Sequence, residues 1–280
     1  MLGQALMREA HRRSLDVCGA SRSRSDYRVD IRDDAGLVRM LDETAPRVVV
    51  NCAAITDLNA CEADPGQTYA VNARAVSILA EHCALRGIHL VQISTDHYFT
   101  GDAGRKHDED AAVRLVNEYA RCKYAGERFA LTCAGSLVVR TNVVGFRGWQ
   151  HHPTFVEWAL NSLKSGAAMT LFSDFYTSSI DVEHFASALF DAISKRATGV
   201  LNIASREVSS KQTFIEALAR AVHCPLSNAK SGSVTSVHGA PRAESLGLDV
   251  GKAEELLGYR FPGLDEVIVA LTNQYAKISI

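Results

Sequence analysis

The chain has 280 residues, of which 47% are hydrophobic, so it can bury a sizeable core in one large domain or two coupled ones. Lys and Arg number 30 against 32 Asp and Glu, and the formal net charge of -2 excludes an overall basic field that would recruit nucleic acid or an anionic membrane. The sequence contains no apolar stretch of about 18 residues that could span a bilayer, so we expect a cytoplasmic protein without a membrane partner.

Helical and strand patterns alternate along the first two thirds of the chain. Residues 1–14, MLGQALMREAHRRS, have the pattern of an amphipathic helix. Short apolar runs rich in β-branched residues lie at positions 15–18, 47–52, 89–95, 137–143 and 200–203. This alternation predicts an α/β fold whose doubly wound parallel sheet is covered by helices on both faces.

Two helices of this alternation can be placed by their end signals. Asp64 and Pro65 supply an N-cap and first-turn pair, and Gly87 ends the same helix. A second helix is predicted over residues 117–130, directly before the strand SLVVRT.

After Gly145 the alternation loosens. Helical patterns cover residues 155–163, 182–194 and 210–222. We therefore divide the chain into a sheet domain over residues 1–145 and a smaller mixed α/β lobe over residues 146–280 that faces the substrate. No Pro/Gly/Ser-rich linker separates the two, so we expect them to interleave, with segments near residues 178–205 completing the first domain.

Tyr119 and Lys123 are the most informative pair of residues. They lie four residues apart on the helix predicted over residues 117–130 and so share a face. The Lys123 ammonium can lower the pKa of the Tyr119 phenol, and the hydroxyl of Thr95 at a strand end can orient a substrate oxygen toward it. Such an arrangement suits proton transfer to or from a carbonyl or an alcohol. The alternative is a solvated helix face, which most Tyr-x-x-x-Lys spacings are.

Several stretches, taken together and in order, resemble one family. They are VVVNCAAITDLNACEADP, AVNARAV, HLVQISTDHYFTGD, NEYARCKYAGE, VVRTNVVG, DFYTSSIDVEHFA, GVLNIASREVSSKQTF and LGLDVGKAEELLGYRFP. With them the chain resembles the extended short-chain dehydrogenases/reductases, and most of all the dTDP-4-dehydrorhamnose reductase family and its sugar-nucleotide relatives. The resemblance covers nearly the whole length and implies that residues 1–145 form an NAD(P)-binding Rossmann domain.

The resemblance also implies a catalytic set. Tyr119 would be the general acid that protonates the substrate carbonyl oxygen as hydride arrives, while Lys123 would lower the pKa of Tyr119 and bind the nicotinamide ribose. Thr95 would hydrogen-bond the reacting oxygen, Asp96 would contact the substrate or the cofactor, and Thr141 is expected to contact the substrate. For Thr95 the alternative is a hydroxyl that caps the backbone at the strand end, and for Asp96 a purely structural role is an equal alternative.

The cofactor would lie on small residues at another strand end. Cys52, Ala53 and Ala54 would form the floor under it, because small side chains permit close approach, and Asn72 would brace the strand ends from its helix.

Arg22 and Asp30 bear on the choice of cofactor. Arg22 sits where an acidic residue would receive a ribose 2′-hydroxyl, and arginine at that place suits a 2′-phosphate instead. NADPH is therefore favoured, with NADH as the alternative; a solvated basic turn would also explain Arg22. Asp30 resembles the family position near the adenine, although it could equally be a turn residue.

The start of the chain departs from the family pattern. Residues 1–4, Met-Leu-Gly-Gln, resemble the tail of a glycine-rich turn, and Gly3 is the one glycine of that cofactor loop that can be named. The strand and two glycines that would precede it are not in the sequence. We expect in-frame codons upstream of Met1 to encode them.

No metal site is expected. The seven cysteines are scattered without a C-x-x-C pair or zinc spacing, and the neighbouring His151 and His152 are typical of a surface loop. Reduced thiols are the expected state of the cysteines.

The leading hypothesis is therefore an enzyme that reduces a nucleotide-linked 4-keto sugar with NADPH and that can form a homodimer. Two alternatives stay open. One is a sugar-nucleotide epimerase or dehydratase, although no Asp-Glu pair stands beside Thr95. The other is a non-catalytic cofactor-binding regulatory subunit that resembles the β subunit of methionine adenosyltransferase, since a fold does not fix a function.

Overall fold

A central parallel sheet organises the computed structural model, which describes residues 1–23, 25–149 and 151–278. Its strands are β3 (Val48–Asn51), β4 (His89–Ile93), β6 (Leu137–Arg140) and β11 (Gly199–Asn202). They run in parallel in the order β11-β6-β4-β3. Val91 and Leu137 on the middle strands are fully buried, as expected where both faces of a parallel sheet are covered.

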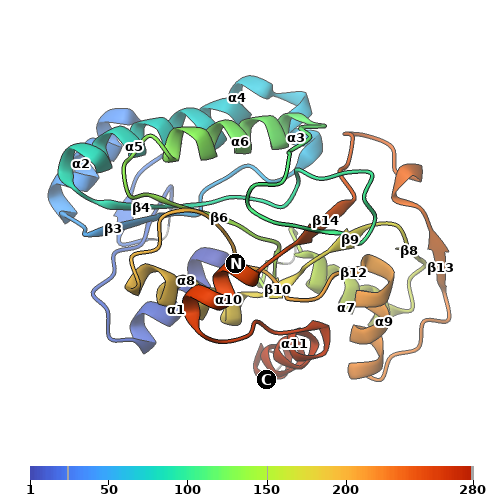
Figure 1. Cartoon of the computed structure of the whole chain (residues 1–280). Coiled ribbons are helices and arrows are strands. Elements are labelled where there is room, and N and C mark those ends of the chain that lie inside the picture. Colours follow the sequence, from blue (N-terminus) through green and yellow to red (C-terminus); the bar gives the residue numbers. More distant parts are fainter. Residues whose placement is uncertain (24, 150, 279–280) are drawn as a thin grey trace.

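Helices cover both faces of this sheet (Figure 1). On one face lie α2 (Asp34–Thr44), α5 (Ala75–Arg86) and α6 (Glu118–Ala130), which share a core with Leu90 and Val138. On the other lie α1 (Leu2–Arg12), α8 (Val182–Ser194) and α10 (Gly251–Leu257), which share a core with Val91 and Leu137. This arrangement confirms the expected doubly wound class.

The crossover between β3 and β4 contains the helix predicted between Asp64 and Gly87. The Asp64 side chain accepts a hydrogen bond from the amide of Gln67, and Gly87 ends the helix in the left-handed conformation. A π-turn interrupts the helix, a feature that the sequence pattern did not indicate. The helix consists of α4 (Pro65–Tyr69), the π-turn η1 (Ala70–Arg74), which is one turn of π-helix, and α5, and the short helix α3 (Leu58–Ala63) precedes it.

The π-turn places its backbone against α6. A Cβ atom added to Gly126 of α6 would lie 2.4 Å from the carbonyl oxygen of Asn72 in the π-turn. The two helices therefore approach this closely because Gly126 has no side chain.

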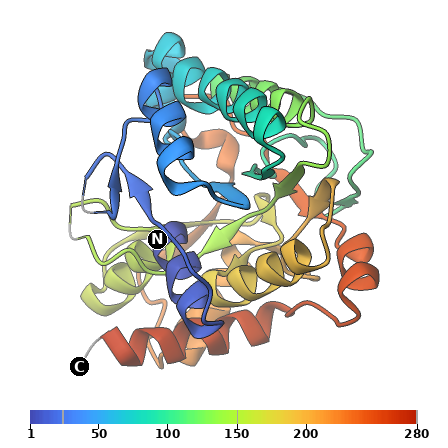
Figure 2. The same cartoon turned by 90° about the vertical axis from the view of Figure 1, so that its left-hand side faces the viewer.

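The N-terminal region differs from the expected pattern. The helix predicted over residues 1–14 is present as α1, but the strand predicted over residues 15–18 is wrong, because those residues join no ladder. The first strand, β1 (Ala20–Ser21), pairs with β2 (Tyr27–Arg28) in a separate small sheet (Figure 2). A strand needs a neighbouring strand to which its backbone groups can hydrogen-bond. Among the described residues β3 pairs with β4 alone, so residues 15–18 do not extend the central sheet beside β3.

Further strands, all but β5 from the second half of the chain, lie outside the central sheet. They are β5 (Lys106–His107), β7 (Val143–Val144), β8 (Met169–Phe172), β9 (Tyr176–Thr177), β10 (Ile180–Asp181), β12 (Ser209–Ser210), β13 (Ala229–Gly232) and β14 (Ser245–Leu248). Four of them form a sheet in the order β12-β9-β14-β5, while β13 pairs with β8 and β10 with β7.

A second core lies among the helices of this half. Phe214 and Leu160 are buried in it. Its helices are α7 (Phe155–Ser165), α9 (Lys211–Ala221) and α11 (Leu264–Ile278), and a short 3-10 turn, η2 (Val234–Ser236), lies before β14. Because β11 belongs to this half yet joins the central sheet, the boundary at residue 145 stays a prediction. Within the described ranges no helix is long and apolar enough to cross a membrane.

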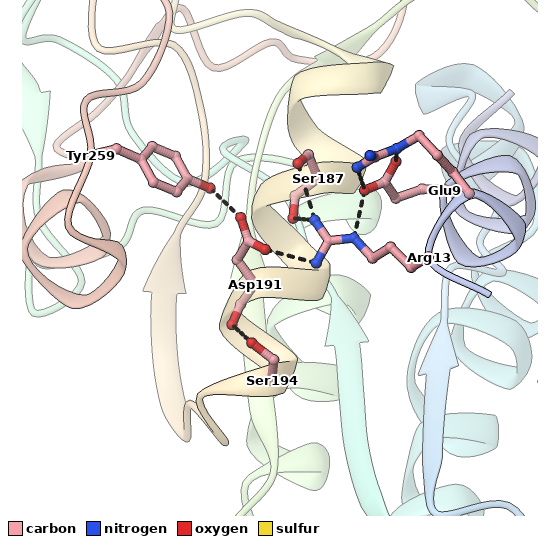
Figure 3. A network of polar contacts seen from close by, with 7 residues as sticks. Glu9, Arg13, Ser187, Asp191, Ser194 and Tyr259 are labelled. Carbon is pink, nitrogen blue, oxygen red and sulfur yellow. Dashed lines mark hydrogen bonds and ion pairs between the residues drawn. The ribbon is translucent and has the colours of Figure 1, made fainter. Parts of the chain in front are cut away.

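A network of hydrogen bonds and ion pairs connects α1 with α8 (Figure 3). The Arg13 guanidinium donates to Glu9 Oε1 at 2.6 Å, to Asp191 Oδ1 at 2.7 Å and to the Ser187 Oγ at 3.1 Å. The Tyr259 hydroxyl donates to the other Asp191 oxygen at 2.9 Å. A hollow of about 390 Å³ borders Asp191 and Tyr259, and none of the residues expected at the active site lines it.

Candidate active site

The candidate site lies where the parallel strands of the central sheet end. Thr95 and Asp96 follow β4, and Thr141 follows β6. Because β4 and β6 are parallel neighbours, these residues lie at the same edge of the sheet. All three side chains are buried.

Tyr119 and Lys123 reach this edge from α6, whose first turn is capped by the side chain of Asn117. The Thr95 hydroxyl lies near the Tyr119 phenol, close enough to influence its pKa. The Lys123 ammonium donates a hydrogen bond of 2.7 Å to the carbonyl oxygen of Ile93, the last residue of β4. The structure thus brings Thr95, Tyr119 and Lys123 together around the end of one strand.

Burial governs the ionisation of this pair. It raises the pKa of the Tyr119 phenol above 10; the nearby Thr95 hydroxyl opposes that rise and the nearby Asp96 adds to it. The direction is opposite to the lowered pKa expected from Lys123, whose ammonium is directed at the Ile93 carbonyl. Burial also lowers the pKa of Lys123 to about 8. A phenol that keeps its proton at neutral pH is the form that a general acid requires.

Asp96 is held by amide and hydroxyl groups. Asn142 Nδ2 donates to Asp96 Oδ2 at 2.7 Å, and Thr95 Oγ1 donates over a longer 3.4 Å to Asp96 Oδ1. Burial raises the pKa of Asp96, while the bond from Asn142 and the positive charge of Lys211 lower it. A carboxylate fixed in this way can accept hydrogen bonds from substrate hydroxyls, although that role remains a prediction.

Three residues that the sequence did not single out lie in the same region. His97 packs edge-on against the Tyr119 ring at 5.7 Å between ring centres. Burial and the charges of Lys211 and Arg242 lower the pKa of His97 to about 4, so His97 is neutral at neutral pH. His97 could have been identified from the sequence, because it stands two residues after Thr95. Lys211 and Arg242 lie more than 100 residues farther along the chain, where no local pattern marks them.

Three buried polar atoms without a partner lie in this region, and others lie at Asp34, His89 and Asn202. Within the described residues, His97 Nδ1, Thr141 Oγ1 and Arg242 Nε are buried and make no hydrogen bond. Such atoms are uncommon in protein interiors and favour a site that binds a polar ligand.

The residues expected beneath the cofactor lie at the end of β3. Cys52 and Ala53 are exposed, and a Cβ atom added to Gly3 in α1 would contact the Cys52 sulfur at 3.6 Å. Ala54 is half-buried. Asn72 accepts from the Ile55 amide and donates to the Ile55 carbonyl, both at 2.9 Å, and so holds the loop that follows β3.

Arg22 and Asp30 lie farther out. Arg22 is exposed directly after β1, and its carbonyl oxygen accepts a hydrogen bond from the Arg28 side chain. Asp30 pairs with Arg32 at 2.7 Å, and this hydrogen bond lowers the pKa of Asp30 to about 2. The roles expected for both residues in cofactor binding stay predictions.

Comparison with known proteins identifies relatives over the whole chain. The profile of one family, described as RmlD substrate binding domain, matches residues 1–276. A probable low-salt glycan biosynthesis reductase, Agl14, from Haloferax volcanii is 27% identical over 100% of this chain and 96% of that protein. A dTDP-4-dehydrorhamnose reductase from Streptomyces griseus is 37% identical over 47% of this chain and 42% of its own length. Methionine adenosyltransferase 2 subunit beta from Xenopus tropicalis is 25% identical over 94% of this chain and 81% of that protein.

Solved structures agree with the fold. The dTDP-4-dehydrorhamnose reductase of Bacillus anthracis str. Ames, in complex with NADP, superposes with a TM-score of 0.87 and 22% identity and covers 98% of this chain and 94% of that chain. The expected Rossmann fold and the resemblance to sugar-nucleotide reductases are therefore confirmed.

Proposed function

The chain belongs to the RmlD substrate binding domain family, and we propose that it reduces a nucleotide-linked 4-keto sugar with NADPH, as a dTDP-4-dehydrorhamnose reductase does. The Haloferax volcanii and Streptomyces griseus relatives are reductases by name, which confirms the expected enzyme class, an oxidoreductase. One observation carries the finer proposal: Thr95, Tyr119 and Lys123 converge on the carboxyl end of β4.

In this proposal Tyr119 delivers the proton. Its phenol stays protonated at neutral pH because burial raises its pKa, so it can donate to the oxygen of a carbonyl that is being reduced. Thr95 lies beside it and orients the same oxygen. The Lys123 side chain is held by its hydrogen bond to the Ile93 carbonyl. When Lys123 is protonated, it supplies positive charge near the Tyr119 phenol.

The residues around β3 fit a dinucleotide. The exposed small residues Cys52 and Ala53 and the nearby Gly3 allow the close backbone approach that a dinucleotide needs. Arg22, exposed after β1, would pair with a 2′-phosphate, and Lys123 would bind the nicotinamide ribose. When bound, the reduced nicotinamide supplies the hydride.

The substrate would lie against the buried polar groups on the other side of Tyr119. Asp96 offers a carboxylate acceptor, and Thr141 Oγ1, His97 Nδ1 and Arg242 Nε are buried without partners in the described chain. A sugar carries many hydroxyls, which can both donate to and accept from such groups. This match supports a sugar ring as the reacting part of the substrate.

The direct test is the oxidation of NADPH in the presence of dTDP-4-dehydrorhamnose, followed by absorbance. Tyr119→Phe should lower kcat/KM by at least about 10²-fold, the lower range for a positioned general acid. Tyr124→Phe is the matched control, since Tyr124 lies on the same helix but packs against Tyr98; its activity should stay near wild type. Full activity of a folded Tyr119→Phe protein would refute the role of Tyr119.

A second candidate is a non-catalytic cofactor-binding subunit, because the methionine adenosyltransferase subunit aligns with 94% of this chain. Calorimetry with NADPH, combined with the turnover assay, separates the two candidates. Binding of NADPH without turnover of any dTDP- or UDP-linked 4-keto sugar would favour the binding subunit, whereas turnover that depends on Tyr119 favours the enzyme.

A further inference from the structure

Lys211 is a cation in an unfavourable position. It is the first residue of α9, after the N-cap Ser210, where the helix dipole disfavours positive charge. The residue is half-buried, and its ammonium lies 4.3 Å from the centre of the Phe155 ring and 5.8 and 5.9 Å from those of Phe175 and Phe214. The rings compensate part of this cost, yet burial still lowers the pKa of Lys211. A lysine so placed suggests a specific negative partner.

That partner is Asp96, which hydroxyl and amide groups join to Lys211. Lys211 Nζ donates over a long 3.4 Å to Ser179 Oγ, which donates to Asn142 Oδ1 at 2.9 Å. Asn142 Nδ2 in turn donates to Asp96 Oδ2 at 2.7 Å. The other oxygen of Asp96 accepts from Thr95. A continuous, partly buried chain of hydrogen bonds thus runs from the carboxyl end of β4 to the start of α9.

The other ionisable groups near Asp96 do not replace Lys211. His97, next in the chain, is neutral because burial and the two cations lower its pKa to about 4. Tyr119, from α6, is uncharged at neutral pH. Arg242, from the segment before β14, acts on His97. Among the described residues, Lys211 is the cation that opposes the effect of burial on the pKa of Asp96.

We propose that Lys211 is a positioning residue that favours the ionised form of Asp96, so that the Asp96 carboxylate is available as a fixed hydrogen-bond acceptor for a sugar hydroxyl beside Thr95 and Tyr119. Asn142 and Ser179 fix the positions of the Lys211 and Asp96 side chains relative to each other. The inference rests on the proposed function for the identity of the ligand, a sugar ring. The coupling between Lys211 and Asp96 can be measured without any substrate.

The first experiment measures the ionisation of Asp96 by carbon-13 NMR of the full chain, labelled at its aspartate side-chain carboxyl carbons. Asp96→Asn assigns the resonance. Lys211→Met removes the charge and places an apolar side chain among the surrounding phenylalanines. It should raise the titration midpoint of Asp96 by at least about one pH unit, a tenfold change in proton affinity. Lys211→Arg, which keeps the charge, and Lys230→Met, which removes an exposed lysine of β13, should leave it unchanged. An unchanged midpoint in folded Lys211→Met overturns the proposal.

The second experiment follows kcat/KM for reduction of dTDP-4-dehydrorhamnose against pH. Lys211→Met should lose about tenfold near pH 6, and the loss should shrink toward about pH 8.5, because a carboxyl with a raised pKa ionises again as the pH rises. Lys211→Arg should restore the wild-type profile. A loss that is equal at every pH indicates a structural role only and contradicts the proposal. If the wild type reduces no 4-keto sugar, the proposed function fails, while the NMR titration still decides the role of Lys211.

Discussion

Arg140 on β6 and Glu127 on α6 form a buried ion pair that ties the central sheet to the helix bearing Tyr119. The guanidinium meets the carboxylate at 2.9 Å and 3.1 Å through two nitrogens, and the side chains are 5% and 1% exposed. Arg140 also donates to the Glu109 carbonyl and lies over the Tyr98 ring. Glu127 therefore supplies the negative charge that makes a buried Arg140 tolerable.

Removing that negative charge should destabilise the protein strongly. Glu127→Gln leaves the Arg140 charge buried without its counter-ion, and we expect a loss of about 3 kcal/mol or more in the free energy of unfolding by urea. Glu118→Gln breaks the exposed pair with Arg121 and should cost less than about 1 kcal/mol. Equal losses in the two variants would show that the buried pair contributes nothing special.

Lys123 should make stability depend on alkaline pH. Its pKa is lowered from 10.5 to about 8, so the unfolded chain binds more protons between these values and stability rises with pH across that window. Lys123→Met has no such group. The free energy of unfolding of Lys123→Met, relative to that of the wild type, should therefore be highest below about pH 8. It should fall by about 3 kcal/mol as the pH rises to about 10.5. A difference that does not change with pH, measured by denaturant unfolding, would contradict the buried ammonium.

Arg22 should discriminate between the two cofactors. Arg22→Ala is expected to weaken NADPH at least about tenfold more than NADH, because a charge-assisted contact to the 2′-phosphate is lost for NADPH alone. Titration calorimetry with each cofactor measures both constants. Arg28→Ala, a change at a nearby basic residue, serves as the control. If Arg22→Ala weakens the binding of both cofactors equally, Arg22 is a solvated surface residue without a role in cofactor choice.

Gly126 should tolerate no side chain. Alanine there would place Cβ 2.4 Å from the Asn72 carbonyl oxygen, so α6 or the π-turn must shift, at an expected cost of about 1–3 kcal/mol in stability. In Gly66→Ala the new Cβ would meet its nearest neighbour, the Asp64 side chain, at an ordinary 3.5 Å, and this helical site should lose nothing. Thermal unfolding of both variants, with kcat/KM for Gly126→Ala, checks whether the shift reaches Tyr119.

Features specified by neighbouring residues were predicted well from the sequence. The helix from Asp64 to Gly87 begins and ends where its caps indicate, and α8 has the predicted bounds. The strand-end positions of Thr95 and Thr141 follow from short buried runs and from the rule that parallel strands end at one edge. Local pattern was sufficient in these cases because the determinants lie within a few residues.

Features that depend on distant segments could not be predicted. A strand at residues 15–18 would need a partner for its backbone, and the pattern of those residues does not reveal whether one is present. The rise in the pKa of Tyr119 comes from burial, which outweighs the expected effect of Lys123. Lys211 and Arg242 reach the site only through the packing of the second half of the chain, so no spacing in the sequence connects them with Thr95.

The contacts of Arg13 have a consequence for local unfolding. α1 is joined to α8 by the network around Asp191 and by the shared core of Ala5 and Leu6. Helices so joined open as one cooperative unit, so the backbone amides of α1 should exchange with deuterium at the rate of α8 instead of fraying early, as terminal segments usually do. Arg13→Met should uncouple them, and mass spectrometry should then detect fast exchange over residues 2–12 while α8 keeps its protection.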